Sequence, residues 1–210
     1  MTPQTDPRNP SVRVAALDGL RGLSALLVVL AHITTHLPVA PYPTGGNVGV
    51  IAFFVLSGYL IGGQCWDRGM QPAWYRKFLR RRAVRLLPAT TVLAVLVSLM
   101  LLGQGLVPGG DLLAASAATL TQTMGLAWAS GLPEVPPLSP TWSLTSEWVF
   151  YLSAPLVMRA IRNRVPPQGA VRPLAAMAAG LYVLGLPLGG KAFYLLPLAN
   201  LAPIWLGAAL

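Results

Sequence analysis

Residues 47–63 read NVGVIAFFVLSGYLIGG, an apolar run without a charged side chain. Residues 17–33, LDGLRGLSALLVVLAHI, form a second run of the same length that is almost as apolar. Both runs are continuous, whereas a membrane β-strand alternates apolar and polar residues with a period of two. Since a helix needs about 20 apolar residues to cross a bilayer, both stretches predict membrane-spanning α-helices.

The composition of the whole chain agrees with a membrane protein. Of its 210 residues, 54% are hydrophobic and 10% are charged, with a mean hydropathy of +0.60. A soluble domain carries about 25% charged residues, and a bilayer tolerates only backbones that satisfy their own hydrogen bonds. We predict an all-α, polytopic helical membrane protein with about six to seven hydrophobic helices, at residues 17–37, 47–66, 83–102, 111–130, 142–158, 174–190 and 192–210.

The net charge of +9 is concentrated in short cationic blocks beside the apolar spans. This pattern is typical of residues that orient a membrane protein with its cations in the cytoplasm, so we expect a lipid bilayer and no nucleic acid as partner. We predict a multi-pass protein of the cell (inner or plasma) membrane with a cytoplasmic N-terminus. The blocks are Arg8 and Arg13; Arg76, Lys77, Arg80, Arg81 and Arg82; and Arg159, Arg162, Arg164 and Arg172.

The segment at residues 111–130 is the weakest of the predicted spans. If every segment crossed the membrane once, the third cationic block would lie outside the cell. The segment carries Thr119, Thr121, Gln122 and Thr123 between loops rich in glycine and proline. We therefore predict that it is re-entrant or lies along the outer surface, so that the next helix starts from the outer side.

Two polar residues of the first span need a reason, because charged groups inside a membrane are costly unless they are paired or line a cavity. Arg21 and His32 are eleven residues apart, which places them on one helix face about 16 Å apart along the axis. His36 follows one turn later, and Asp18 lies where it can pair with Arg21. The spacing alone leaves an alternative to a functional role for each residue. Arg21 can anchor the helix at the membrane interface, and His32 can form a hydrogen bond between helices.

Three further residues are candidates for a site. Arg82 and Arg85 lie three apart, on the first turn of the predicted helix at 83–102; arginines in such a cluster either orient the chain or bind a diphosphate such as that of coenzyme A. Glu147 is a lone carboxylate that can orient a histidine, position a hydroxyl or anchor helices. The single Cys65 offers neither a disulfide nor a metal-binding pair, and we expect no metal.

Four segments, LDGLRGLSALLVVLAHI, GVIAFFVLSGYLI, RRAVRLLP and WSLTSEWVFYL, resemble in this order the acyltransferase-3 family of membrane proteins. The resemblance implies transfer of an acyl group, commonly acetyl, from acyl-CoA as donor substrate to a hydroxyl of a carbohydrate or secondary-metabolite acceptor, with no permanently bound cofactor. It implies that His32 and Glu147 are catalytic and that Arg21, Arg82 and Arg85 handle the donor. His32 would act as general base or transient acyl carrier.

The chain also departs from the family pattern. Many relatives carry an acid where this chain has Ile51 and Ala52, and a second acid where it has Trp148. The family's membrane domain is longer, so we expect residues 1–14 to be a cytoplasmic tail and residues 15–210 to be a C-terminally incomplete acyltransferase domain. The alternatives are a carrier or flippase for lipid-linked sugars and a non-catalytic truncated membrane subunit.

Overall fold

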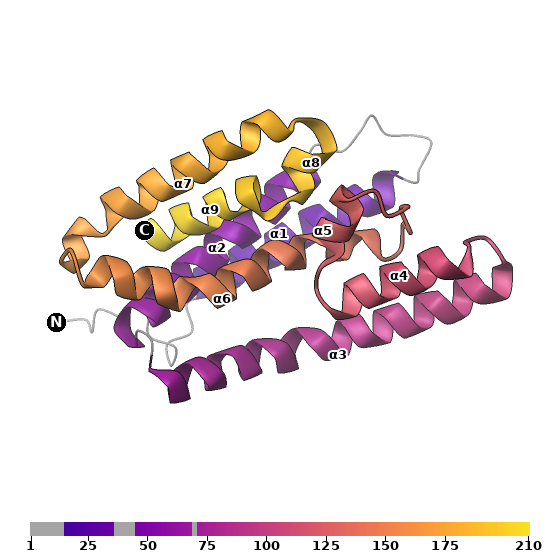
Figure 1. Ribbon diagram of the computed structural model, residues 1–210, viewed down its shortest axis with the longest axis horizontal. Coiled ribbons are helices and arrows are strands. Elements are labelled where there is room, and N and C mark those ends of the chain that lie inside the picture. Colours follow the sequence, from indigo (N-terminus) through magenta and orange to yellow (C-terminus); the bar gives the residue numbers. More distant parts are fainter. Residues whose placement is uncertain (1–14, 36–44, 69–70) are drawn as a thin grey trace. The chain divides into compact units, whose positions relative to one another are not determined.

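The computed structural model of the chain describes residues 15–35, 45–68 and 71–210. Within these ranges every regular element is helical, which confirms the predicted all-α class (Figure 1). Arg8, Arg13, His36 and the predicted tail at 1–14 lie outside the described residues. The α-helices are α1 (Ala15–Thr35), α2 (Gly45–Arg68), α3 (Pro72–Gln104), α4 (Gly109–Leu120), α5 (Met124–Ala129), α6 (Trp142–Arg162), α7 (Val171–Gly185), α8 (Gly190–Leu195) and α9 (Pro197–Ala209), with short 3-10 helices η1 (Ser139–Thr141), η2 (Pro167–Gly169) and η3 (Leu186–Leu188).

Four helical stretches are long and apolar enough to cross a membrane, namely Ala15–Thr34, Gly46–Arg68, Pro72–Gln104 and Pro167–Leu188. Large apolar side chains on all four of them are exposed, among them Leu23 on α1 and Leu96 on α3. A lipid bilayer solvates such side chains, whereas water does not. The chain is thus a multi-pass membrane protein, and the count of six to seven spans stays a prediction.

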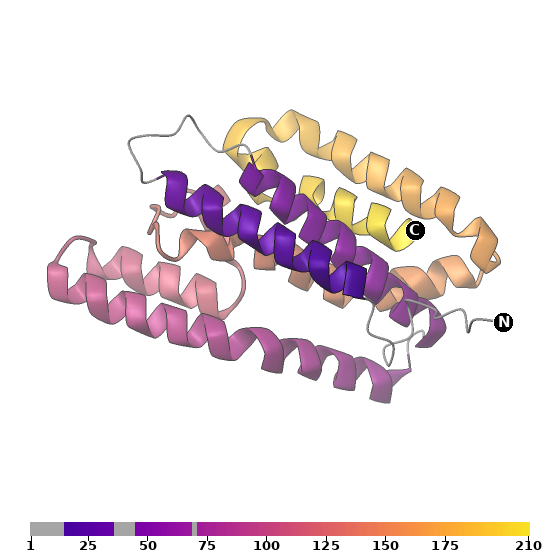
Figure 2. The ribbon, with the colours of Figure 1, turned by 180° about the vertical axis from the view of Figure 1, so that it is seen from behind.

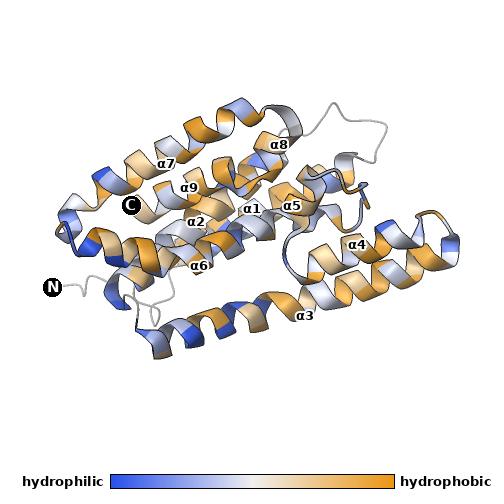
Figure 3. Ribbon diagram, in the orientation of Figure 1, coloured by the Kyte–Doolittle hydropathy of each residue, from blue (hydrophilic) through white to orange (hydrophobic). Residues whose placement is uncertain are grey.

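Helix α3 begins at Pro72, well before the predicted start at residue 83. Proline suits the first turn of a helix because its missing N–H is not needed there. One turn further, Trp74 and Phe78 stack with their ring centroids 5.2 Å apart and extend an apolar face into the cationic stretch. The prediction that Arg82 and Arg85 lie on the first turn is therefore wrong. Figure 3 shows the hydrophilic first part of α3 and its hydrophobic continuation.

The segment predicted as one helix at 111–130 forms two, α4 and α5. Between them Gln122 adopts a left-handed backbone with φ of 60°, and α4 lies along the second half of α3 (Figures 1 and 2). The hydroxyls of Ser98 and Ser116 join these two helices at 2.8 Å. Whether the segment is re-entrant or lies along the outer surface stays a prediction.

The segment predicted as one helix at 192–210 is divided as well. Helix α8 ends before Leu196, which has an extended backbone with φ of −74° and ψ of 146°. Proline disfavours the helical conformation of the residue before it, and Pro197 starts α9. The prediction of a single helix here is therefore wrong for a local and identifiable reason.

The chain forms two compact units, and each of the helices α6, α7 and α9 contributes residues to both. Among the described residues, unit 1 consists of 15–35, 45–68, 157–180 and 202–210, and unit 2 of 71–156 and 181–201. In unit 1, α1 lies along α2, as the indigo and purple ribbons of Figure 2 show. Small residues permit this approach, because a Cβ added at Gly49 would lie 2.6 Å from the carbonyl oxygen of Ser24.

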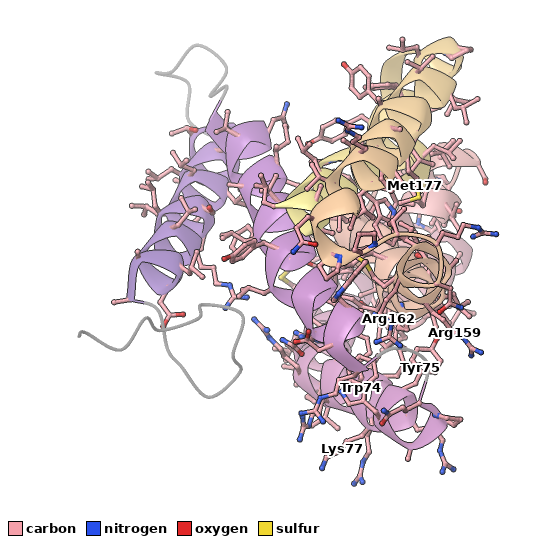
Figure 4. The ribbon with its side chains drawn as sticks, turned by 90° about the vertical axis from the view of Figure 1, so that its left-hand side faces the viewer. Trp74, Tyr75, Lys77, Arg159, Arg162 and Met177 are labelled. Carbon is pink, nitrogen blue, oxygen red and sulfur yellow. The ribbon has the colours of Figure 1, made fainter. Side chains whose placement is uncertain are left out.

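The end of α6 caps the end of α2 in unit 1. Arg162, labelled in Figure 4, donates from Nη1 to the carbonyl oxygen of Trp66 at 2.8 Å. The last carbonyls of a helix have no partner within the helix, and a cation near them is stabilising. The C-terminal ends of α2 and α6 therefore lie at the same end of this unit.

Candidate active site

In unit 2, an arginine of α3 and a carboxylate of α6 meet at one aromatic ring. Glu147 and Tyr151 are four residues apart on α6 and so share a face of the helix. The Tyr151 hydroxyl donates to Oε2 of Glu147 at 2.7 Å. The Cζ atom of Arg82 lies 5.4 Å from the centroid of the same ring and 5.3 Å from that of Phe78. The geometry is that of a cation–π pair whose ring also holds a carboxylate.

Further aromatic contacts fix this ring. Tyr151 is only 4% exposed and meets Phe78 and Trp148 edge-on, at centroid distances of 6.0 and 5.9 Å. Edge-to-face pairs of this kind stabilise beyond the area that they bury. Tyr75 adds a hydrogen bond from its hydroxyl to the carbonyl oxygen of Leu152 at 3.2 Å. The first half of α3 is thereby attached to α6, and Arg82 is held in place.

Arg85 lies one turn beyond Arg82 and is exposed, whereas Arg82 is partly buried. Arg76, Lys77, Arg80 and Arg81 are exposed too, and Figure 4 shows the nitrogen of Lys77 extending away from the start of α3. Exposed guanidinium groups are free to meet an anion, and one long helix presents them all. Both uses predicted for these cations, orientation in the membrane and binding of a diphosphate, fit this arrangement.

Arg21 and His32 lie on α1 in unit 1. Arg21 is partly exposed, and its Nη1 lies 4.0 Å from Oδ1 of Asp18, which matches the pairing that the spacing predicted. His32 is exposed, and its Nδ1 lies 2.7 Å from the carbonyl oxygen of Val28. Since a carbonyl oxygen can only accept, Nδ1 is the donor of this bond, and in the neutral imidazole Nε2 then has the lone pair.

The contacts of α1 with α2 define the face on which these two residues lie. Ser24 is 1% exposed, and Ala31 approaches Gly46 so closely that an added Cβ there would lie 2.6 Å from its Cβ. At 100° per residue, Arg21 and His32 lie about 60° to 80° from Ser24 and about 20° from each other. They form one stripe that flanks the packed face of α1.

The structure thus brings Arg82 and Glu147 together through Tyr151, a residue that the sequence-based prediction did not name. Its spacing of four residues from Glu147 was the signal that would have identified it. Arg85 joins them on the next turn of α3. Arg21 and His32 share a stripe on α1, with about 16 Å between them along the axis.

A second polar cluster lies inside unit 2, deeper along α3. Gln122 is 4% exposed and donates from Nε2 to Oγ1 of Thr90 at 3.0 Å and to the carbonyl oxygen of Thr119 at 2.8 Å. Thr119 also contacts Thr141, with 3.5 Å between their Oγ1 atoms. These hydrogen bonds join α3 to the turn between α4 and α5, and Oε1 of Gln122 is buried without a hydrogen-bond partner among the described residues.

Fold and site together define a multi-pass helical membrane protein with a histidine, a carboxylate and several arginines on its helix faces. The family described as "Acyltransferase domain" matches residues 14–210. The chain belongs to this family, which confirms the resemblance that the sequence motifs indicated.

Curated relatives agree with the family. A putative membrane-bound transacylase, BcsY of Komagataeibacter xylinus, is 35% identical over 68% of this chain and 36% of its own length. The acyltransferase MdmB of Streptomyces mycarofaciens is 31% identical over 81% of this chain and 44% of its own length. The peptidoglycan O-acetyltransferase OatA of Listeria monocytogenes is 38% identical over 40% of this chain and 13% of its own length. The chain thus spans less than half the length of these relatives, and no solved structure matches it.

Proposed function

We propose that this protein is a membrane-embedded O-acyltransferase that moves an acyl group, acetyl in the simplest case, from acyl-CoA to a hydroxyl of a carbohydrate or related acceptor. The observation that carries the proposal is the hydrogen bond of His32 to Val28 at 2.7 Å. Because Nδ1 is the donor in this bond, Nε2 is the basic nitrogen and has its lone pair directed away from the helix backbone. A histidine in this state is suited to remove a proton from a hydroxyl.

In the proposed reaction, Nε2 of His32 takes the proton of the acceptor hydroxyl. The hydroxyl oxygen attacks the thioester carbonyl carbon, the carbon–sulfur bond breaks, and the imidazolium returns the proton to the sulfur of CoA. The products are an ester and free CoA thiol. If His32 is instead a transient acyl carrier, Nε2 attacks the thioester carbonyl carbon, the carbon–sulfur bond breaks and CoA leaves as the thiolate. The acceptor hydroxyl then attacks the acyl-imidazolium, the acyl–nitrogen bond breaks, and the hydroxyl proton passes to the thiolate, which restores neutral His32.

The donor, acyl-CoA, is a substrate rather than a resident cofactor in this scheme. We assign its phosphates to Arg82 and Arg85 and the entrance of the site to Arg21, since the guanidinium fork matches phosphate oxygens. The exposure of Arg85 supports this role. The spacing of Arg21 and His32, about 16 Å along α1, suits an extended donor whose nucleotide stays at the membrane interface.

Glu147 had two proposed roles, to orient His32 or to orient the acceptor. The bond from Nδ1 of His32 to Val28 already fixes the imidazole ring. We therefore assign Glu147 to the acceptor hydroxyl.

We place the N-terminus in the cytoplasm and the protein in the cell membrane. The three cationic blocks support this orientation, because cytoplasmic loops of membrane proteins carry an excess of Lys and Arg. The bond of Arg162 to Trp66 supports it as well, because it puts the ends of α2 and α6 at one end of unit 1. The second cationic block follows the end of α2 at Arg68, and the third begins in the last turn of α6.

Purified chain in lipid nanodiscs, incubated with radiolabelled acetyl-CoA and methyl glucoside as a soluble hydroxyl probe, tests the proposal. We expect release of CoA thiol that His32→Ala abolishes, by about 100-fold or more. Thr34→Ala is the matched control, because Thr34 lies two residues away and bonds only carbonyls of α1 among the described contacts. Full activity of the His32→Ala variant refutes the assignment of His32.

The same assay separates an enzyme from the other candidate functions. A carrier for lipid-linked sugars would move its cargo without releasing CoA, and a non-catalytic subunit would do neither. If the wild-type chain releases no CoA thiol above the rate of protein-free nanodiscs, the proposed function is wrong for this chain.

A further inference from the structure

We infer that Tyr151 is a positioning residue that orients the Glu147 carboxylate relative to the donor-binding arginine Arg82. The inference rests on the proposed function and extends it to Tyr151, a residue of the WSLTSEWVFYL motif to which the sequence analysis gave no role. Its basis is that the side chain of Tyr151 makes two contacts. The hydroxyl donates a hydrogen bond to Oε2 of Glu147 at 2.7 Å, and the ring centroid lies 5.4 Å from Cζ of Arg82.

A glutamate needs such a partner if it is to orient a substrate. Its side chain has three rotatable bonds, so the carboxylate of a helical glutamate samples several positions when nothing holds it. Tyrosine has two rotatable bonds and a rigid ring. A hydrogen bond from a fixed phenol to one carboxylate oxygen therefore selects one rotamer of Glu147.

The phenol is fixed by its surroundings. Tyr151 is 4% exposed, and its ring meets Phe78 of α3 and Trp148 of α6 edge-on. A ring wedged between side chains of two helices changes rotamer only if the helices separate. The position of the hydroxyl is therefore set by the packing of α3 against α6.

The same ring links the carboxylate to the donor side of the site. A guanidinium over the face of a phenol is attracted by the ring electrons, and the phenol donates to the carboxylate with its hydroxyl, so the three groups form one connected unit. Acceptor and donor must meet in a single geometry for acyl transfer, since misplacement by about 1 Å lowers the rate by about 100-fold. Tyr151 therefore fixes the position of the Glu147 carboxylate, assigned to the acceptor, relative to the Arg82 guanidinium, assigned to the donor.

The Tyr151→Phe variant tests this role, because it removes the hydroxyl and keeps the ring over which Arg82 lies. We expect kcat for CoA release from acetyl-CoA, with methyl glucoside as acceptor probe, to fall by about 10- to 100-fold. The KM for acetyl-CoA should stay within about twofold, since the contact of Arg82 is kept. Tyr182→Phe is the matched control, because Tyr182 belongs to the same unit, is 49% exposed and has a ring contact with Phe193.

A double variant separates positioning from general stability. If Tyr151 acts through Glu147, then Tyr151→Phe combined with Glu147→Gln is no slower than Glu147→Gln alone, because the carboxylate to be oriented is absent. Rate losses that multiply in the double variant refute the inference. So does a Tyr151→Phe variant with unchanged kcat, or one in which only the melting midpoint falls. A wild-type chain without any CoA release refutes the proposed function, and this inference with it.

Discussion

Among the described residues, backbone contacts at glycines are tighter in unit 1 than in unit 2, where the closest approach of an added Cβ is 2.8 Å, at Gly125 to the carbonyl oxygen of Leu195. In unit 1, helices touch at glycines: a Cβ added at Gly58 of α2 would lie 1.8 Å from the carbonyl oxygen of Ile204, and one at Gly207 of α9 would lie 2.0 Å from that of Val55. In unit 2, side chains join α3 to α6 and to the turn after α4, through Tyr151 and Gln122. Small residues permit backbone contact in a membrane, where helices gain little from burying apolar surface.

This difference bears on the proposed site. The stripe of Arg21 and His32 lies on a helix that small residues hold against α2, where His32 is exposed and Arg21 is partly exposed. Arg82 and Glu147, by contrast, belong to the contacts that hold their own helices. We therefore expect substitutions of Arg21 and His32 to affect acyl transfer alone. Substitutions of Arg82 and Glu147 should lower the free energy of unfolding as well.

The strongest test of the comparison is Gly58→Ala in unit 1. The new Cβ would overlap the backbone of α9, which cannot move aside as a flexible side chain would, so we expect a loss near or above the upper end of the 1 to 3 kcal/mol typical of overpacking. Thermal unfolding of the detergent-solubilised protein measures it. The matched control is Gly180→Ala in α7, where an added Cβ meets nothing within 4 Å and alanine favours the helix by about 1 kcal/mol. Equal midpoints for the two variants would contradict glycine-mediated packing.

The next prediction concerns the polar cluster of unit 2. Gln122→Leu removes both hydrogen bonds of Nε2 and should lower the free energy of unfolding by about 1 to 3 kcal/mol, since each bond contributes about 0.5 to 1.5 kcal/mol. Gln122→Gly removes the same bonds but relieves the left-handed backbone at φ of 60°, which is worth about 1 kcal/mol. We expect Gln122→Gly to be less destabilised than Gln122→Leu. Identical melting midpoints would show that backbone strain is unimportant at this turn.

Much of this architecture could be predicted from sequence, because the helix signal in a membrane protein is local. Long apolar runs predicted α1, α2 and the start of α6 to within a few residues. The spacing of four residues between Glu147 and Tyr151 also indicates that their side chains share a helix face. The start of α3 could not be placed in this way, since its cationic first part becomes helical where Trp74 and Phe78 pack toward Tyr151.

Two other features depended on information that the pattern lacks. Nothing in Thr121, Gln122 and Thr123 signals the end of a helix, because the residue in the left-handed conformation, Gln122, is neither glycine nor asparagine. The hydrogen on Nδ1 of His32 depends on one contact with Val28. The meeting of Arg82 with the ring of Tyr151 depends on which helices are neighbours, a property that residue spacing along one helix does not contain.

The smallest expected effect distinguishes two arginines of the same helix. Arg82→Lys keeps the charge but loses the planar group that lies over Phe78 and Tyr151, so we expect a loss of about 0.5 to 1 kcal/mol in stability and a rise of about tenfold in the KM for acetyl-CoA. Arg85→Lys is the matched variant one turn away. Because Arg85 is exposed, its replacement should leave the melting midpoint unchanged and raise KM by only about two- to threefold. If both variants lowered the midpoint equally, the contact of Arg82 with the two rings would not be what holds α3 to α6, and the contrast between a packed and an exposed arginine would fail.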